Sequence, residues 1–407
     1  KEEAACAVTS VPLKAEATPR DATPRLEPPP PQCIARCGRR ELLACFLGTG
    51  CAAPSTYRAP AAIYLHAFER GGLLLDAGEG CLGQLGRTFG TAGTAAVLRR
   101  LTAVWISHAH ADHHLGLPTL LAAVERARTP PALPLGARHA TPPLLVIGPH
   151  AIGRWLERYQ ALLPPARRLR VAFAHNEAVN NPRCTERHWL LRQSGLGLAS
   201  LRSVRVLHCP DAWGIVLDGK AGWRLVYSGD TRPCSALAAA GARATLLTSW
   251  TFPGPLLEHL PAGAGATLLI HEATFSAEQS AMALRKRHSS TSEALGVAAA
   301  MGAYRTVLTH LSARYESEAS AAWASSSSIV AYDGLTLNLA DLPRCTAAAP
   351  PIERFFKAVA AREATAAAAE SARLAARSVS IETLLEVQRW LEGVVATVVR
   401  TAAGGPG

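Results

Sequence analysis

The sequence lacks the features that mark a disulfide-linked or a membrane-spanning protein. Its ten cysteines are scattered over 407 residues and include no Cys-x-x-Cys pair, so neither a zinc ribbon nor a disulfide scaffold is indicated. No apolar run reaches the roughly 18 residues that a transmembrane helix needs. Because scattered cysteines favour a reducing compartment, we expect an intracellular protein of the nucleus, the mitochondrion or another organelle, with no membrane partner.

Acidic residues are scarce relative to basic ones. The chain has 31 Asp and Glu against 42 Lys and Arg, a formal charge of +11, and such an excess attracts anionic partners such as nucleic acid at long range. Hydrophobic residues make up 49% of the chain, enough to build a core for one large or two ordinary domains. The composition therefore predicts a globular protein that favours an anionic partner.

Composition divides the chain into three parts. Residues 1–38 are rich in proline, alanine and charge, and we expect them to form a disordered linker. Since the chain starts at Lys1 instead of Met, we expect a targeting segment or a whole domain upstream of it. Residues 39–342 carry alternating strand and helix patterns and form the expected catalytic domain. Residues 343–407 are alanine-rich and predicted to form a helical extension.

An internal repeat marks a candidate insertion. The segment Ala244–Leu247 recurs as Ala266–Leu269. Residues 248–269 contain Pro253-Gly254-Pro255 and show no periodic pattern, which favours either a surface loop or an unspliced stretch of the gene. We therefore expect this segment to have no ordered role.

Polar residues follow several apolar runs that are typical of buried strands. The run from Leu101 to Ile106 precedes a segment rich in histidine, and shorter runs precede His208, Asp230 and His310. This repeated pattern means that several strands deliver polar side chains to one rim of a sheet sandwich. An α/β protein with a site at that rim is predicted.

The histidine-rich segment has the composition of a dinuclear zinc site. His108, His110, Asp112 and His113 lie within six residues, and several imidazoles beside a carboxylate are what such a site needs. Because alternate residues of an extended turn point the same way, His108 and His110 can hold one ion while Asp112 and His113 face a second. His114 is expected to be structural, because the following helix turns it away.

The strand-end residues together give seven candidate ligands for two Zn²⁺ ions. Asp230 is the better bridging carboxylate, because Gly229 permits close backbone approach. The later residues also have ordinary alternatives: a strand-end histidine bonded to backbone for His208, a turn residue for Asp230 and a helix cap for His310. Paired zinc ions activate water and stabilise an in-line phosphoryl displacement, which predicts a hydrolase. The seven are His108, His110, Asp112, His113, His208, Asp230 and His310.

The order of the motifs resembles that of the metallo-beta-lactamase-fold tRNA 3'-processing endoribonucleases, tRNase Z, and specifically the catalytic C-terminal half of the long form. The zinc motif alone specifies only the superfamily, whereas the segments at 271–275 and 288–291 specify the family. The resemblance implies an αββα sandwich of two mixed sheets flanked by helices. The matching segments are Phe46–Gly50, Leu75–Gly80, His108–His113, Ser228–Arg232, His271–Phe275, His288–Thr291 and Leu308–Tyr315.

The same resemblance implies an activity and residue roles. The activity is zinc-dependent removal of the 3' trailer from precursor tRNA by hydrolysis at the discriminator nucleotide, which leaves a 3'-hydroxyl. Asp112 would accept the proton of the attacking water, while His288 would protonate the leaving ribose oxygen and Glu272 would orient it. A helix cap for Glu272 and a solvated basic face for His288 are the alternatives. Zinc ligation is implied at His108, His110 and His208 on one side and at Asp112, His113 and His310 on the other, with Asp230 between.

Three further features concern the substrate. Phosphate contacts need only positive charge and reach, and the candidates are Arg58, Arg232, Arg287 and Arg314. Thr56 and Ala59 stand where the family has the Lys and Asn of Pro-x-Lys-x-Arg-Asn, so rejection of CCA-bearing tRNA does not follow for this chain. The 22 positions from His208 to Asp230 leave no room for the tRNA-gripping arm of short-form enzymes, so we expect a missing N-terminal half to carry it.

Two rival functions remain open at this point. Another hydrolase of the superfamily, such as a phosphodiesterase or thioesterase, shares the zinc motif but does not need the 271–275 and 288–291 segments or the basic charge. An inactive RNA-binding half is a different class, and the intact ligands argue against it.

Overall fold

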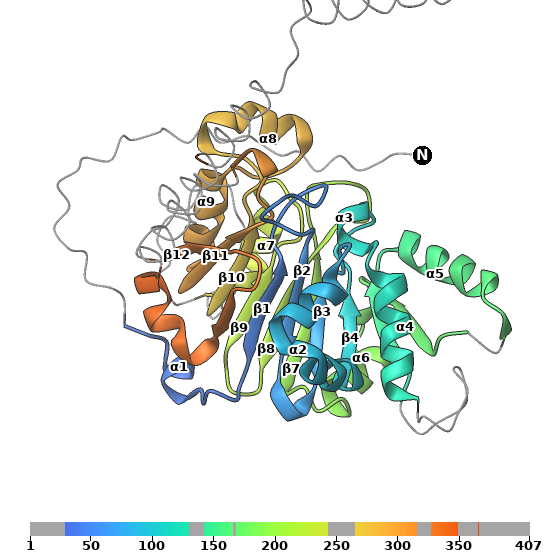
Figure 1. Ribbon diagram of the computed structural model, residues 1–407. Coiled ribbons are helices and arrows are strands. Elements are labelled where there is room, and N and C mark those ends of the chain that lie inside the picture. The colour runs from blue at the N-terminus through green and yellow to red at the C-terminus, as the bar shows by residue number, and fades with distance from the viewer. Residues whose placement is uncertain are drawn as a thin grey trace, which may run out of the picture.

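Two mixed sheets stacked face to face form the centre of the protein (Figure 1). The computed structural model describes residues 29–129, 142–165, 168–242, 265–315, 327–348 and 365. The first sheet has the order β13-β1-β2-β3-β4-β5-β6 and the second has the order β12-β11-β10-β9-β8-β7. The first contains β1 (Leu43–Gly48), β2 (Ala62–His66), β3 (Gly72–Leu75), β4 (Leu101–Trp105), β5 (Leu144–Gly148), β6 (Val171–His175) and β13 (Thr336–Asn338). The second contains β7 (Leu198–Arg205), β8 (Trp213–Gly219), β9 (Arg224–Tyr227), β10 (Leu268–Glu272), β11 (Arg305–Thr309) and β12 (Ser328–Val330).

Each sheet is antiparallel at one side and parallel at the other. In the first sheet β1, β2 and β3 pair antiparallel, and β3 to β6 pair parallel. In the second sheet β7, β8 and β9 pair antiparallel, and β9 to β12 pair parallel. The carboxyl ends of β3, β4, β9, β10 and β11 therefore reach one end of the sandwich, where open α/β folds place their sites.

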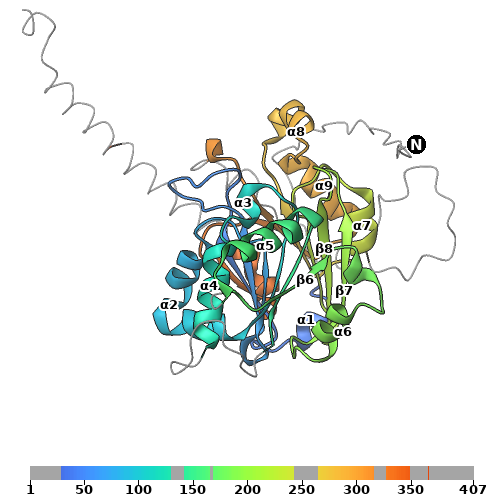
Figure 2. The same cartoon turned by 90° about the vertical axis from the view of Figure 1, so that its right-hand side faces the viewer.

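Helices cover both outer faces of the sandwich, as the two views show (Figures 1 and 2). The first sheet is covered by α2 (Cys81–Arg100), α4 (Leu117–Arg128) and α5 (His150–Leu162), and the second by α7 (Ser235–Gly241) and α9 (Thr291–Met301). The shorter helices are α1 (Gln32–Arg36), α3 (Ala111–His114), α6 (Thr185–Arg192) and α8 (Ser280–Lys286). The predicted αββα sandwich is confirmed. Among the described residues no helix is both long and apolar enough to span a membrane.

Four clusters of buried apolar side chains among the described residues hold these parts together. The inter-sheet core contains Trp105, Trp213 and Tyr227, while separate apolar clusters fill the spaces under the outer helices. Gly90 interrupts α2 with a φ of 67°, a backbone conformation that glycine adopts without strain. The strand β4 is buried at every position and apolar at every position except Thr102. Strands of a parallel sheet have this character when both faces of the sheet are covered.

The structure corrects the predicted boundaries of the catalytic domain. Part of the expected linker at 1–38 is folded, since α1 places Ile34 in the inter-sheet core; residues 1–28 lie outside the described residues. The predicted end at 342 is also too early, because the 3-10 helix η6 (Leu339–Ala348) buries Leu342 and Cys345 in that core. The predicted extension beyond 348 falls outside the described residues, apart from Thr365.

The candidate insertion at 248–269 needs a similar correction at its end. Ala266 is buried, and Leu268 at the start of β10 pairs with Leu225 and Arg305. The second copy of the repeat is therefore part of the second sheet, not of a surface loop. Residues 243–264, which include the whole first copy of the repeat, lie outside the described residues.

The last two strands belong to different sheets. The structure pairs β12 with β11 and β13 with β1, and Asp333-Gly334 lies between the two strands. Asp333 thus lies where the chain crosses between the layers. Its carboxylate accepts hydrogen bonds from Thr49 N (3.0 Å), Thr49 Oγ1 (2.7 Å) and Ala59 N (2.6 Å), and so fastens the loop after β1.

Candidate metal centre

All seven predicted ligands meet at one end of the sandwich, the end where α3 lies (Figure 1). The chain leaves β4 through Ser107 and His108 and then forms α3, which carries Asp112 and His113. His208, Asp230 and His310 follow β7, β9 and β11. The strand-end pattern of the sequence therefore corresponds to a single cluster of side chains.

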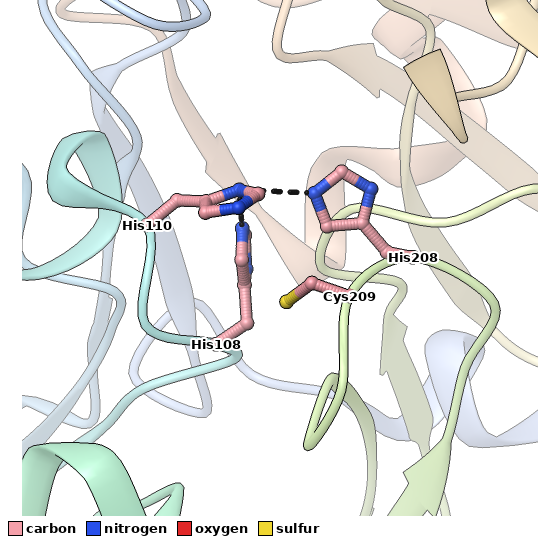
Figure 3. Close-up of side chains that lie close together, drawn as sticks. All are labelled: His108, His110, His208 and Cys209. Carbon is pink, nitrogen blue, oxygen red and sulfur yellow. Dashed lines mark hydrogen bonds between the residues drawn. The ribbon is translucent and has the colours of Figure 1, made fainter. Parts of the chain in front are cut away.

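The first group of donors contains three imidazoles. The Nδ1 atom of His110 lies 2.9 Å from Nε2 of His108 and 3.1 Å from Nε2 of His208 (Figure 3). Burial lowers the pKa of each of these rings, most strongly that of His108. Rings that stay neutral keep a lone pair for a metal ion, which is the form in which histidine binds zinc.

The second group combines two imidazoles with carboxylates. His113 Nε2 lies 3.2 Å from His310 Nε2, and Asp112 Oδ2 lies 3.3 Å from His310 Nε2. Asp230 sits between the two groups, because its Oδ2 is 3.2 Å from His113 Nε2 and 3.6 Å from His108 Nε2. Its Oδ1 is buried, accepts no hydrogen bond and lies 3.4 Å from His310 Nε2, so this oxygen faces the second group.

The charges of the centre also fit metal ions. Burial opposes a charge on His113, yet Asp230, Asp76 and Asp112 surround the ring and raise its pKa well above its usual range. The pKa values of Asp112 and Asp230 are lowered despite burial, because imidazoles face both carboxylates. Buried carboxylates need compensating positive charge. Five imidazoles and two carboxylates are a donor set that suits zinc.

A shell of further residues fixes the orientation of the candidate ligands. The fully buried carboxylate of Asp76 accepts hydrogen bonds from His113 Nδ1 (2.8 Å), Ser107 N (2.7 Å) and Tyr227 Oη (2.8 Å). Nδ1 of His208 faces the carbonyl oxygen of Arg287, and Nδ1 of His310 faces Thr274 Oγ1 at 2.9 Å. Partners at Nδ1 leave Nε2 free to bind the metal.

Asp76 was not among the predicted site residues. It stands directly after β3, as the predicted ligands stand after their strands, so the same signal identifies it. Asp76, Arg287 and His310 all have left-handed backbones, with φ of 56°, 58° and 59°. Such conformations are costly for residues other than glycine and gather at functional sites.

Glu272 and His288 form a hydrogen-bonded pair beside the centre. His288 Nδ1 lies 2.9 Å from Glu272 Oε1 and 3.9 Å from Asp230 Oδ2. Glu272 is buried and also accepts from Thr231 N and Thr274 Oγ1. Burial opposes the charged ring, but the carboxylates of Glu272 and Asp230 raise the pKa of His288 to about 9. Neither the helix cap for Glu272 nor the solvated basic face for His288 describes this arrangement.

The structure separates the four candidate arginines into two pairs. Arg58 is buried, donates to Thr49 Oγ1 and Ala331 O at 2.7 Å each, and stacks on Tyr332. Arg232 binds Glu293 and donates to the carbonyl oxygen of His288 at 2.7 Å. Both guanidinium groups thus have partners within the protein, and substrate contact by Arg58 and Arg232 stays a prediction. Arg287 and Arg314 are exposed and stay candidates.

Comparisons with known proteins agree with this geometry. The family model of the beta-lactamase superfamily domain matches residues 72–311. The protein named "tRNase Z TRZ3, mitochondrial" of Arabidopsis thaliana is 32% identical over 387 residues, which cover 80% of this chain and 38% of that protein. The human "Zinc phosphodiesterase ELAC protein 2" is 34% identical over 316 residues, which cover 76% of this chain and 35% of that protein. The chain thus spans little more than a third of the length of these relatives.

A solved structure shows the same fold. The long form RNase Z from yeast superposes with a TM-score of 0.60 at 21% identity, over 78% of this chain and 44% of that chain. The family match covers more than half of the sequence, and the strand ends gather histidines and aspartates that could hold metal ions. The chain therefore belongs to the metallo-beta-lactamase superfamily and is similar to tRNase Z proteins over most of its length.

Proposed function

We propose that this chain is the catalytic part of a zinc-dependent endoribonuclease that removes the 3' trailer from precursor tRNA and leaves a 3'-hydroxyl at the discriminator nucleotide. The observation that carries the proposal is the Glu272–His288 pair beside the metal centre. A hydrolase whose leaving group departs without protonation has no use for it, whereas a departing ribose alkoxide needs a general acid. The names tRNase Z and zinc phosphodiesterase among the relatives support this choice.

Two zinc ions would be held by the two donor groups. His108, His110 and His208 would bind one ion, His113, His310 and Asp112 the other, and Asp230 both. Bound there, the ions would supply Lewis acidity to the water and to the phosphoryl oxygens.

Asp112 would receive a proton from the attacking water. Its Oδ2 is held by Ala52 N at 2.7 Å and by His310 at 3.3 Å. Burial alone would raise the pKa of Asp112, but His113 and His310 lower it, so the carboxylate is ionised at neutral pH. It takes up the proton transiently, since a low pKa favours its release.

His288 carries the proton for the leaving group. A pKa of about 9 keeps the ring protonated at neutral pH. Glu272 fixes Nδ1, and Arg232 holds the backbone carbonyl of His288 while it is itself held by Glu293. These contacts leave Nε2 to donate to the 3' oxygen of the discriminator ribose.

The grip on tRNA is expected to come mainly from outside this catalytic part. Between His208 and Asp230 the chain forms only β8 and β9 with their connections, so no protruding arm lies there. Arg287, which also donates to the carbonyl oxygen of His208 at 3.1 Å, and Arg314 are exposed and would add phosphate contacts that weaken with salt. The relative named as mitochondrial supports an organellar location.

Incubation of the purified chain with a precursor tRNA and with a small phosphodiester, each with and without chelator, tests the proposal. We expect chelator-sensitive cleavage after the discriminator nucleotide, with a 3'-hydroxyl on the tRNA product. Hydrolysis of the small phosphodiester alone would identify a different hydrolase. Binding of the precursor without cleavage in zinc-loaded protein would identify an RNA-binding scaffold.

A further inference from the structure

A thiol lies beside the three imidazoles of the first donor group. Cys209 follows His208 directly, in the connection between β7 and β8. One ligand atom from each of His108, His110, His208 and Cys209 lies within 4.8 Å of all the others. In Figure 3 the side chain of Cys209 leaves its loop below His208, and its sulfur points toward His108.

No other described cysteine has this placement. Of the nine described cysteines, Cys209 alone belongs to a group of side chains that can share a metal ion. Cys51 is the informative comparison. Burial raises the pKa of its thiol, and Asp230 and Asp112 lie close enough to raise it further. Cys51 nevertheless belongs to no group of side chains that can share a metal ion. Proximity to the centre therefore does not by itself bring a sulfur into ligand range.

The geometry needs only a small adjustment to close around an ion. With Zn–N distances of about 2.0–2.1 Å and a Zn–S distance of about 2.3 Å, the ligand atoms of a tetrahedral site lie roughly 3.3–3.8 Å apart. The two nitrogen pairs at 2.9 and 3.1 Å are slightly closer than this range. The sulfur of Cys209 lies within 4.8 Å of each nitrogen, which is at most about 1 Å beyond the upper end of the range. A side-chain rotation of Cys209 covers such a difference.

The fourth position of this group thus has two candidate donors. Asp230 Oδ2 lies 3.6 Å from His108 Nε2 and 3.8 Å from His208 Nε2, but it also serves the second group through His113 at 3.2 Å. Because both ions would share the Asp230 carboxylate, the first ion would receive only part of its negative charge. The sulfur of Cys209, within 4.8 Å of the ligand atoms of His108, His110 and His208, is the second candidate.

We propose that Cys209 is a sulfur ligand of the metal ion bound by His108, His110 and His208. This inference rests on the metal binding in the proposed function but not on RNA cleavage. When the ion binds, the metal–sulfur bond forms as the thiol loses its proton to solvent, so one proton is released for each sulfur bound. A sulfur ligand gives the first site a preference for softer ions, whereas the second site, built from nitrogen and oxygen alone, has none.

Cobalt titration of the full chain, stripped of metal, tests the ligand directly. Cobalt bound to a thiolate shows a sulfur-to-metal charge-transfer band in the near ultraviolet, which nitrogen and oxygen ligands do not give. We expect this band in the unaltered chain and in Cys51→Ser, and its loss in Cys209→Ser, while both variants still bind cobalt by elemental analysis. A band that persists in Cys209→Ser, or cobalt binding without any band, would overturn the assignment.

Zinc K-edge X-ray absorption of the unaltered chain gives a second readout that needs no variant. A scattering shell at about 2.3 Å, distinct from the nitrogen and oxygen shell at about 2.0–2.2 Å, is expected. A spectrum fitted by nitrogen and oxygen alone would refute the sulfur ligand even if Cys209→Ser failed to fold. Failure of the chain to bind either metal would refute the metal centre as well, which separates the two proposals.

Discussion

Asp76 offers the sharpest test of how the metal centre is held. Its Oδ2 accepts from His113 Nδ1 at 2.8 Å, Ser107 Oγ at 2.9 Å and Tyr227 Oη at 2.8 Å, and its Oδ1 accepts from Ser107 N at 2.7 Å. Tyr227 stays a donor, because burial and the Asp76 carboxylate raise its pKa well above the usual value. In Asp76→Asn an NH2 group replaces one of the two carboxylate oxygens. Because both oxygens accept hydrogen bonds in the unaltered protein, this NH2 group faces donors that have lost their acceptor.

The expected result is a weaker second metal site in a folded protein. His113 loses the acceptor that fixes its tautomer, and removal of such a partner lowers metal affinity by roughly 10- to 100-fold, or about 1.4–2.7 kcal/mol. Competition with a coloured chelator measures this loss, and thermal unfolding checks the fold. Asp218→Asn is the matched control, because it makes the same change in a carboxylate that pairs with Arg224 on β9. Equal zinc affinity in a folded Asp76→Asn variant would refute the reasoning.

Four further outcomes follow from the contacts described. Asp112→Ala should bind about one zinc fewer per chain by elemental analysis and cleave precursor tRNA roughly 10²–10⁴-fold more slowly; full activity would contradict its role. His288→Asn should lower kcat by a similar factor with KM and zinc content unchanged. Since the protonated ring is the active form, the unaltered rate should fall as pH rises through about 9, and this alkaline limb should be absent in the variant. Arg58→Ala leaves Thr49 Oγ1 and Ala331 O without their donor, so urea unfolding should show a loss of about 2–4 kcal/mol with RNA affinity unchanged. Deletion of 248–269 should leave folding and zinc binding intact, because Ala244–Leu247 then supplies the start of β10; an insoluble product would show that the segment belongs to the core.

The clustering of the candidate ligands could be predicted because their signal is local. Each candidate follows an apolar strand, and the carboxyl ends of parallel strands meet at one edge, so sequence position alone brings them together. Successive side chains of a strand point to opposite faces of the sheet, so two neighbouring residues at a strand end can have different surroundings. Glu272 faces the site, whereas the adjacent His271 is fully buried and its Nδ1 bonds to the carbonyl oxygen of Glu272.

The missed features depend on contacts between distant parts of the chain. Arg232 is held by Glu293, 61 positions away, and Arg58 by Ala331, 273 positions away. No composition or spacing rule reveals that such a charge already has partners. The same holds for α1, where a proline-rich sequence suggests a linker but Ile34 packs between the sheets.

The crossing at Asp333 bears on when the protein can acquire metal during synthesis. Asp333 holds Thr49 and Ala59 at the ends of a loop whose Ala52 N–H binds the carboxylate of Asp112. We expect a nascent chain on the ribosome to expose the ligands of α3 long before this clamp and His310 have been translated. Metal uptake would then be among the last steps of biogenesis, and chains that stall before Asp333 would leave the ribosome without a closed metal centre.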